Sequence, residues 1–328
     1  MDIQDSEWRI VEKKSAKKDK NVLPVGHTSV TQHIVAKTSS LLSSPAKAHL
    51  PTPPSTQVAT TMRGLQWNSV DYSCAYDSFF TVMWNIWRDR RRLLTSVPDT
   101  QNEYLNKLYE GFALEHDSSI SIEDARDVVR NMLYNQSRRN FPMGTRGANI
   151  HDLLRIMLKC QDSIGQELVS CPSCKHIRSS DPIDSLLVDC IEVHQANAQQ
   201  LMDKWISHES RYSCSTCRVK LHMGRHFQSI PKFFVISVPD EITFTVTKTI
   251  SISFADGVIK HYSLSGLIYY GQAHFVSRFI DKFNNVWFHD GMLNGGQSQL
   301  EREISSYTEE HLGTCGNKEL AAVIYISM

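Results

Sequence analysis

Eight cysteines and fourteen histidines give this 328-residue chain several groups that could act as nucleophiles, bases or metal ligands. Cys74 opens an almost wholly apolar run that continues to Trp87. Such a run predicts a buried helix, because it lacks the polar face of a surface helix. Cys74 would then lie in the first turn, where free backbone N–H groups and the helix dipole favour a thiolate. The alternative is a buried structural cysteine, since free cysteine is among the most buried residue types.

A cysteine nucleophile needs a histidine as its base and a third group that orients the imidazole. His274 lies at the start of a predicted strand, and Asp290 ends the next strand 16 residues later. A hairpin turning at Asn284–Asn285 would bring these two side chains together. Asp281 competes for the third role, but an odd offset from His274 places it on the opposite face of an unbulged strand. The spacing therefore favours Asp290.

Four further cysteines form two Cys-x-x-Cys knuckles, with 39 residues between them. Two such knuckles supply four thiolates, which is the closed tetrahedral set of a structural Zn²⁺ site. No ligand position is left open for water, so we expect a structural metal rather than a catalytic one. The predicted ligands are Cys171, Cys174, Cys214 and Cys217. The remaining thiols, Cys160, Cys190 and Cys315, are interpreted as core or surface cysteines.

Composition indicates a globular chain, with 41% hydrophobic and 21% charged residues. Residues 64–328 hold 26 of the 35 basic and 30 of the 35 acidic residues, so this part is slightly acidic. A nucleic-acid-binding face is therefore not expected. No apolar stretch approaches the ~20 residues of a membrane span, and the start of the chain lacks a signal-peptide pattern. We expect an intracellular protein, in the cytoplasm or the nucleus, with reduced thiols.

The chain has two consecutive regions that differ in composition and in residue pattern. Residues 1–63 contain one aromatic residue and many Ser, Thr, Pro and Lys residues, which predicts a disordered tail. The lysines between 13 and 20 are either a nuclear-localisation patch or a solvated charge run, and the second interpretation is favoured. Residues 64–328 form the predicted domain, with helical periodicity to about residue 159 and strand patterns after it. Helices first and an antiparallel sheet afterwards indicate an α+β fold.

The predicted elements follow from apolar spacing and from the Pro, Gly and Asn turns between them. Helices are expected at 74–87, around 104–112, from about 120 to 133, at 150–159 and at 195–206. Strands are expected at 167–171, 186–193, 233–238, 243–254, 259–268, 273–280, 286–289 and 320–326.

Together these residues resemble the ubiquitin-specific protease family of deubiquitinating enzymes, over roughly residues 64–328. Cys74 and Ser78 match the nucleophile and the final serine of the family's Cys-Tyr-x-Asn-Ser box, although Asp77 stands where the box has Asn. His274 matches the histidine of the family's Gly-His-Tyr segment, and Asp290 the carboxylate after its tryptophan. The family's oxyanion donor is an asparagine just before the nucleophile. Asn68 is its counterpart, one residue further from the cysteine than is usual.

The resemblance implies a papain-like cysteine protease with a helical thumb (64–165), zinc-bearing β fingers (166–230) and an antiparallel β palm (231–328). It implies a monomeric thiol isopeptidase that cleaves after the C-terminal glycine of ubiquitin or a ubiquitin-like modifier through a Cys-His-Asp triad. The Gln66-Trp67 segment is similar to the corresponding segment of family members that act on SUMO. The expected partners are the modifier and its conjugates, and neither a nucleic acid nor a membrane is expected as a partner. The expected cofactor is a structural Zn²⁺. The alternatives are a catalytically silent relative that binds a modifier or partner, and a zinc-ribbon module.

Overall fold

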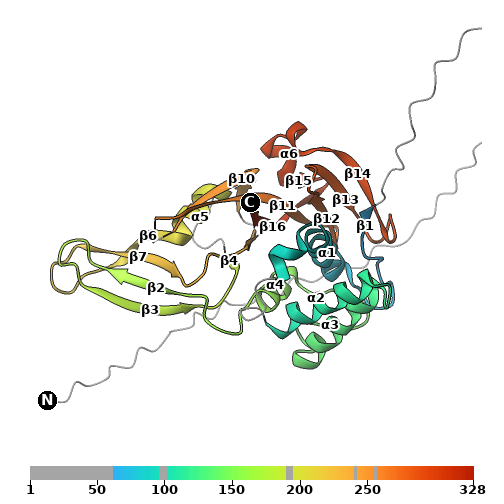
Figure 1. The fold of residues 1–328 in the computed structure, drawn as a ribbon, viewed down its shortest axis with the longest axis horizontal. Helices are drawn as coiled ribbons and strands as arrows, with labels where there is room; N and C mark the ends of the chain where they lie inside the picture. Colours follow the sequence, from blue (N-terminus) through green and yellow to red (C-terminus); the bar gives the residue numbers. More distant parts are fainter. Residues whose placement is uncertain (1–61, 96–101, 190–194, 240–241, 255–256) are drawn as a thin grey trace, which may run out of the picture. The chain divides into compact units, whose positions relative to one another are not determined.

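The computed structural model describes residues 62–95, 102–189, 195–239, 242–254 and 257–328. The predicted tail lies outside the described residues except for its last two positions, and Cys190 lies outside them as well. Within this part of the chain the predicted order is confirmed, with helices first and mostly strands after them (Figure 1). None of the described helices is both long and apolar enough to cross a membrane.

The helices begin at polar caps that the sequence supplies. Ser121 and Asp124 form a reciprocal capping box at the start of one helix, and Asn102 and Asn149 cap two others. The helices are α1 (Cys74–Thr95), α2 (Glu103–His116), α3 (Ile122–Gln136), α4 (Ile150–Met157), α5 (Ala198–Ile206) and α6 (Glu309–Gly313), with a 3₁₀ turn at Ile304–Ser306. Helical geometry in α1 is interrupted at Arg90.

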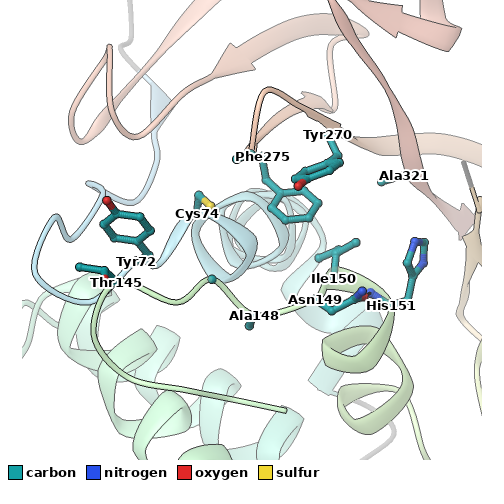
Figure 2. Close-up of a pocket in the computed structure, with 12 residues that line it drawn as sticks. Tyr72, Cys74, Thr145, Ala148, Asn149, Ile150, His151, Tyr270, Phe275 and Ala321 are labelled. Atoms are coloured by element: carbon teal, nitrogen blue, oxygen red, sulfur yellow. Dashed lines mark hydrogen bonds between the residues drawn. The ribbon is translucent and has the colours of Figure 1, made fainter. Parts of the chain in front are cut away.

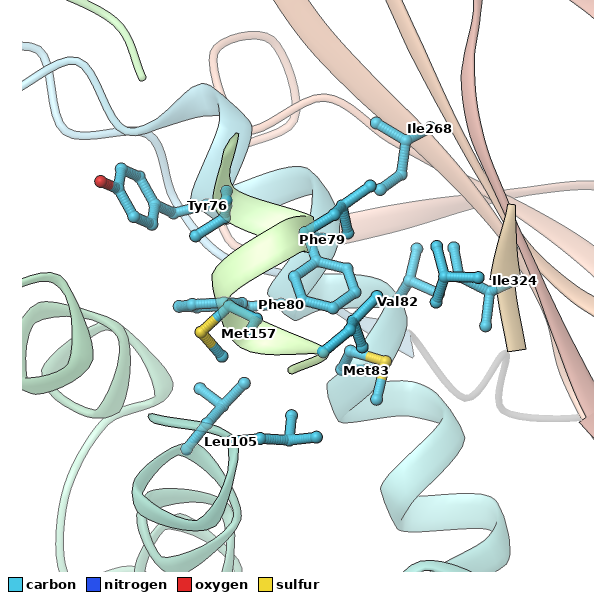
Figure 3. Close-up of a cluster of buried hydrophobic side chains, with 14 of the residues drawn as sticks. Tyr76, Phe79, Phe80, Val82, Met83, Leu105, Met157, Ile268 and Ile324 are labelled. Atoms are coloured by element: carbon cyan, nitrogen blue, oxygen red, sulfur yellow. The ribbon is translucent and has the colours of Figure 1, made fainter. Parts of the chain in front are cut away.

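Helix α1 is the centre of the larger hydrophobic core. Its residues from Cys74 to Trp87 are buried on every side, as the apolar run predicts. Figure 3 shows Phe79 and Val82 of α1 facing the sheet residue Ile324, and other side chains of α1 facing α2 and α4. The backbone of the sheet approaches α1 closely at Gly266, where a Cβ would overlap Val82. This packing fixes the position of the helix that begins with Cys74.

Ten strands form the palm sheet in the described part of the chain. Its main path runs β1-β14-β13-β12-β11-β16-β8-β4, while β10 pairs with β11 and β15 with β16. These strands are β1 (Met62–Arg63), β4 (Leu187–Asp189), β8 (Phe233–Ser237), β10 (Thr249–Ser253), β11 (Ile259–Gly271), β12 (His274–Ile280), β13 (Asn285–His289), β14 (Gln297–Glu303), β15 (Thr314–Cys315) and β16 (Lys318–Ser327). Figure 1 shows α1 between this sheet and helices α2–α4.

A second sheet of four strands, the finger sheet, has the order β3-β2-β7-β6. Its strands are β2 (Gly165–Ser170), β3 (Ile177–Ile183), β6 (Ser207–Ser213) and β7 (Lys220–Phe227). Most side chains of β6 and β7 are exposed or half-buried, so this sheet has little apolar core of its own. A short parallel pair, β5 (Gln195–Asn197) and β9 (Thr243–Thr245), completes the described strands.

Two expectations about the strands are corrected. The palm is not wholly antiparallel, because β4 runs parallel to β8. The single strand expected at 243–254 is two strands, since β9 pairs with β5 whereas β10 pairs with β11. The finger strands β3, β6 and β7 lie within the expected β fingers, but their bounds could not be predicted, because their exposed polar side chains show no apolar alternation. The sheet also begins at Met62, where β1 pairs with β14, two residues before the expected boundary.

Candidate active site

Cys74 is the first residue of α1 and is buried, with 6% of its surface exposed. Its place follows from the chain around it, because Ser73 ends a turn and the apolar run of α1 starts immediately afterwards. The first backbone N–H groups of a helix have no partner within the helix. Cys74 therefore lies where such donors and the positive end of α1 act on a thiol.

His274 begins β12 after a two-residue turn made by Gln272 and Ala273. Both turn residues have positive φ, 55° and 56°, which is the backbone of a type I′ hairpin turn. Glycine and asparagine favour this conformation, so an Ala and a Gln here carry a steric cost. The pairing of Gly271 with His274 closes the hairpin and sets the histidine at the strand end.

The imidazole of His274 interacts with both other members of the expected triad. Its Nε2 lies 2.9 Å from Oδ1 of Asp290, and the side chain of Cys74 is near enough to raise its pKa. Burial lowers the pKa of His274, but the hydrogen bonds and charges of Asp290 and Cys74 outweigh it and raise the pKa to about 9. The geometry thus places a protonated imidazole between a thiol and a carboxylate.

Asp290 follows β13 and is held by the turn after it. Its Oδ1 accepts hydrogen bonds from the backbone N–H groups of Met292 and Leu293, at 2.9 and 3.3 Å. Burial raises the pKa of Asp290, but the hydrogen bond to His274, the histidine charge and these N–H groups together lower it below its ordinary value. Asp290 is therefore a fixed anion that can hold the imidazole in one orientation.

Asp281, the competing carboxylate, has a different environment. It lies in the β12–β13 turn, where Oδ1 accepts the backbone N–H groups of Phe283 and Asn285. Its Oδ2 accepts from the side chains of Asn285 and Trp287, at 3.0 and 2.9 Å. Asp281 thus holds the turn that brings Asp290 back toward His274.

Asn68 lies in the loop before α1, and its side chain closes that loop. Its Oδ1 accepts the backbone N–H groups of Val70 and Asp71, at 3.0 and 3.1 Å, while its own N–H donates to Ser73 Oγ. These contacts are the pattern of an Asx turn. No described residue accepts a hydrogen bond from its side-chain amide nitrogen, so this nitrogen is the group of Asn68 that could donate to an oxyanion.

A buried ion pair beneath this loop was not expected from the sequence. Ser73 Oγ donates to Asp77 Oδ2 over 2.6 Å, and Nη1 of Arg126 lies 2.8 Å from Asp77 Oδ1. The same nitrogen of Arg126 donates to the carbonyl oxygen of Gln66, and Arg130 donates to that of Asp71. Helix α3 therefore holds the loop at Gln66 and Asp71 and holds the start of α1 at Asp77. The available signal was the helical spacing of Arg126 and Arg130, which places two charges on the apolar face of α3.

The segment from Gly64 to Asn68 is also fixed from the palm. His289 Nε2 lies 2.8 Å from the carbonyl oxygen of Leu65, and the N–H of Trp67 donates to the carbonyl oxygen of Gly291. Gly64 packs against the His289 ring so closely that a Cβ would overlap it. The loop before Cys74 and the loop that carries Asp290 are thereby held side by side.

A cavity of about 420 Å³ opens at Cys74. Figure 2 shows Cys74 near its middle, with Tyr270 and Phe275 on the palm side and the segment from Thr145 to His151 on the other. The rings of Tyr270 and Phe275 lie 4.5 Å apart across the β11–β12 hairpin. Cys74 is thus one of the residues in the wall of this cavity.

The four knuckle cysteines meet at the tips of the β2–β3 and β6–β7 hairpins. Their sulfur atoms all lie within 4.8 Å of one another, with Cys171–Cys217 at 3.2 Å and Cys174–Cys214 at 3.6 Å. Zn–S bonds of ~2.3 Å in a tetrahedron place sulfurs ~3.8 Å apart, so this set fits one zinc ion. Backbone N–H groups lower the pKa of Cys171 and Cys214, the latter to about 6. A backbone N–H also lowers the pKa of Cys174, but the neighbouring thiols of Cys171 and Cys214 outweigh it and raise this pKa to about 11. These four cysteines could hold a metal.

No protein-family model matches the chain, and no curated protein matches it. Its fold is similar to a chain of the SAGA DUB module Ubp8/Sgf11/Sus1/Sgf73 bound to monoubiquitin, with a TM-score of 0.54 and 11% identity over 84% of this chain and 72% of that one. The module bound to ubiquitin aldehyde gives a TM-score of 0.52 at 10% identity, over 85% and 72%.

At these identities the likeness concerns the fold alone, and it supports a ubiquitin-specific-protease-like fold. It gives no support to the expected similarity with relatives that act on SUMO.

Proposed function

We propose that this chain is a thiol isopeptidase that releases ubiquitin or a ubiquitin-like modifier from lysine side chains. The observation that carries the proposal is the position of His274 between the thiol of Cys74 and the carboxylate of Asp290, beside a cavity that reaches the thiol. The likeness of the fold to DUB modules bound to ubiquitin supports this substrate class. The same arrangement counts against the alternative of a catalytically silent binding module.

The reaction would begin from an ion pair in which the Cys74 proton has already passed to His274, leaving a thiolate beside an imidazolium. The thiolate then attacks the carbonyl carbon of the modifier's last glycine, and the carbonyl π electrons move to oxygen. The side-chain amide of Asn68 and the first N–H groups of α1 would stabilise that oxyanion. Asp290 keeps the imidazole oriented and stabilises its charge, as the third member of a triad does.

Collapse of the intermediate re-forms the carbonyl and breaks the C–N bond, while His274 gives its proton to the leaving lysine amine. A thioester now joins Cys74 to the modifier. His274 next takes a proton from water, which attacks the thioester and displaces the thiolate. The products are a free lysine and a modifier with a C-terminal carboxylate.

We also propose that the four knuckle cysteines hold one structural Zn²⁺. The finger sheet buries few apolar side chains, so its hairpin tips need another source of stability. Binding of zinc by four thiolates would supply it, because the free energy of metal binding becomes part of the folding free energy.

A modifier with a C-terminal electrophile tests the proposed activity. Ubiquitin and SUMO carrying a C-terminal vinyl sulfone are incubated separately with the full chain, and the adducts are located by mass spectrometry. We expect an adduct with at least one modifier on Cys74, which Cys74→Ala abolishes and Cys315→Ala, a thiol outside the triad, leaves intact. Failure of both modifiers to react with a folded chain whose Cys74 reacts with iodoacetamide would overturn the proposal.

A further inference from the structure

The tips of the β2–β3 and β6–β7 hairpins carry a concentration of positive charge. Five exposed basic residues lie there and are called the fingertip patch, which consists of Lys175, Arg178, Arg211, Arg218 and Lys220. Neither tip, residues 170–180 or 210–222, contains an aspartate or a glutamate. Without these five, residues 64–328 hold 21 basic and 30 acidic residues instead of 26 and 30. The overall acidity that argues against nucleic-acid binding therefore does not describe the fingertip.

The metal knuckles and the finger strands bring these five residues together. Lys175 and Arg218 each follow the second cysteine of a knuckle, and the four knuckle sulfurs lie within 4.8 Å of one another. Arg178 is the second residue of β3. Lys220 begins β7, and its ammonium donates to the carbonyl oxygen of Arg211 over 2.7 Å. The patch therefore lies at one end of the finger sheet, away from the palm sheet (Figure 1).

No described residue forms an ion pair with any of the five cations. The next carboxylates along the finger strands are Glu167, Asp181 and Glu209, which lie beyond the tips. Glu167 lies 3.1 Å from Arg225, its own partner. A zinc ion bound by four thiolates has a net charge of about −2, which offsets two of the five cations. Even when Asp181 and Glu209 are counted with the tip, its net charge stays positive.

Two of the five cations occupy backbone positions that glycine would adopt more easily. The φ angles of Lys175 and Arg218 are 59° and 63°, in the left-handed region. The backbone N–H of each donates to the carbonyl oxygen of the first cysteine of its knuckle, Cys171 or Cys214, over 3.0 Å. The two knuckles thus share one local geometry, and each has a cation where the turn alone favours glycine. Backbone strain of this kind is concentrated at functional sites.

Other exposed groups of the tip suit a single-stranded nucleic acid. Ser173, Ser215 and Thr216 lie between the cysteines of the knuckles, where their hydroxyls can donate to phosphate oxygens. Tyr212 is 58% exposed, and the guanidinium of Arg211 lies 5.0 Å from the centre of its ring. An exposed aromatic ring among cations is the combination on which unpaired bases stack.

We propose that the fingertip patch binds the phosphate backbone of a single-stranded nucleic acid, with a base stacked on Tyr212. This binding is separate from the proposed isopeptidase activity. An acidic protein segment is the competing partner, because the apolar side chains of Ile177 and Val219 are also exposed at the tip. A peptide that extended the sheet would need the cations along one edge strand. The edge strands β3 and β6 carry only one of the five cations each, which favours the nucleic acid.

The test measures the fluorescence anisotropy of a labelled oligothymidylate of about 12 nucleotides, a length typical of single-strand-binding sites. The probe is titrated with the full chain at several salt concentrations. We expect the logarithm of the binding constant to fall against the logarithm of salt concentration with a slope of about −2, as roughly three phosphate contacts predict. Tyr212→Ala should weaken binding about fivefold at every salt concentration and leave the slope unchanged, because stacking releases no counter-ions.

The double variant Lys175→Gly/Arg218→Gly removes two charges and gives each left-handed position the residue that adopts it most easily, so its Tm should not fall. Its Kd should rise about tenfold at low salt, and its slope should become shallower by about one. Arg139→Gln/Lys260→Gln is the matched control, because it removes two exposed cations outside the finger sheet. The control should leave Kd unchanged.

Three results would overturn the inference. The first is no binding at low salt. The second is binding that the glycine variant leaves unchanged, which would place the contact elsewhere, for example on the lysines between 13 and 20. The third is displacement of the probe by an oligoglutamate of equal net charge as effectively as by unlabelled oligothymidylate, which would show that the patch takes an acidic protein segment.

Discussion

The guanidinium of Arg126 and the carboxylate of Asp77 lie 2.8 Å apart, and each side chain is only 3% exposed. The pair joins α3 to the first turn of α1 and, through Ser73 and Gln66, to the loop before Cys74. Removing one partner leaves a buried charge without compensation, whereas removing both charges does not. The pair therefore couples the stability of the fold to the geometry of the loop.

Arg126→Ala should lower the free energy of unfolding by up to about 3–5 kcal/mol. The loss should be smaller where Asp77 takes up a proton, because burial raises its pKa to about 7 although Arg126 lowers it. The double variant Asp77→Asn/Arg126→Gln should lose markedly less, because neither side chain is then charged. Urea denaturation of both variants and the parent measures the difference. Equal losses in the two variants would show that packing around these side chains, rather than the unpaired charge, carries the effect.

The turn before His274 should tolerate stabilising changes. Gln272→Asn and Ala273→Gly place the residues that a type I′ turn prefers at two positions with positive φ. Each change should stabilise the fold by up to about 1 kcal/mol. Thermal denaturation shows the gain as a higher Tm. A lower Tm for the double variant would contradict the assignment of this turn as strained.

The pH profile should report the charge of His274. Its pKa of about 9 keeps the imidazolium present up to mildly alkaline pH, so kcat/KM should fall as the pH rises through about 9. Asp290→Asn removes the negative partner and lowers the pKa of His274, so the alkaline limb should move to lower pH. If kcat/KM of Asp290→Asn falls at the same alkaline pH as that of the parent, Asp290 does not act on this imidazole.

Asp281 and Asp290 should differ in what their loss changes. Asp290→Ala should reduce kcat strongly, because an unoriented imidazole is a poor base. Asp281→Ala removes an acceptor of four hydrogen bonds in the β12–β13 turn and should cost about 2–3 kcal/mol of stability. At a temperature where it remains folded, it should retain most of its turnover. An inactive but folded Asp281→Ala with an active Asp290→Ala would reverse the two roles.

The metal site predicts about one zinc per chain in elemental analysis of the purified protein. A strong chelator should lower the Tm, and Cys171→Ser should do the same without chelator because one thiolate is lost. Cys315→Ser is the matched control, since Cys315 lies in β15 and outside the four-cysteine cluster. Absence of zinc from a folded, fully reduced preparation would contradict the assignment.

The elements that carry the candidate site are those whose sequence pattern is strong. The apolar run after Cys74 indicates a buried helix, and the structure confirms it. His274 and Asp290 are so few residues apart that a single hairpin determines their relative position. The structure of such a segment depends mainly on its own residues and on few contacts with distant parts of the chain. The geometry of the hairpin could therefore be predicted from its own residues.

The remaining features depend on contacts between distant segments. The β-branched residues from 243 to 254 indicate strand, but they do not specify that β9 and β10 pair with different strands. The role of Arg126 depends on the meeting of α3 with the loop at Gln66, about sixty residues away in sequence. Finger strands such as β6 are polar and mostly exposed, so their sequence shows no alternation of apolar and polar residues. Without that alternation, the ends of these strands could not be predicted.

Hydrolysis of an authentic isopeptide bond tests the central claim most directly. A lysine peptide joined through its side chain to the C terminus of ubiquitin or of SUMO is incubated with the full chain, and free lysine peptide is quantified. We predict turnover by the parent, none by Cys74→Ala, and a thioester between Cys74 and the modifier on rapid acid quench. Turnover that survives in Cys74→Ala, or a folded, zinc-loaded parent that cleaves none of these conjugates, would contradict the account.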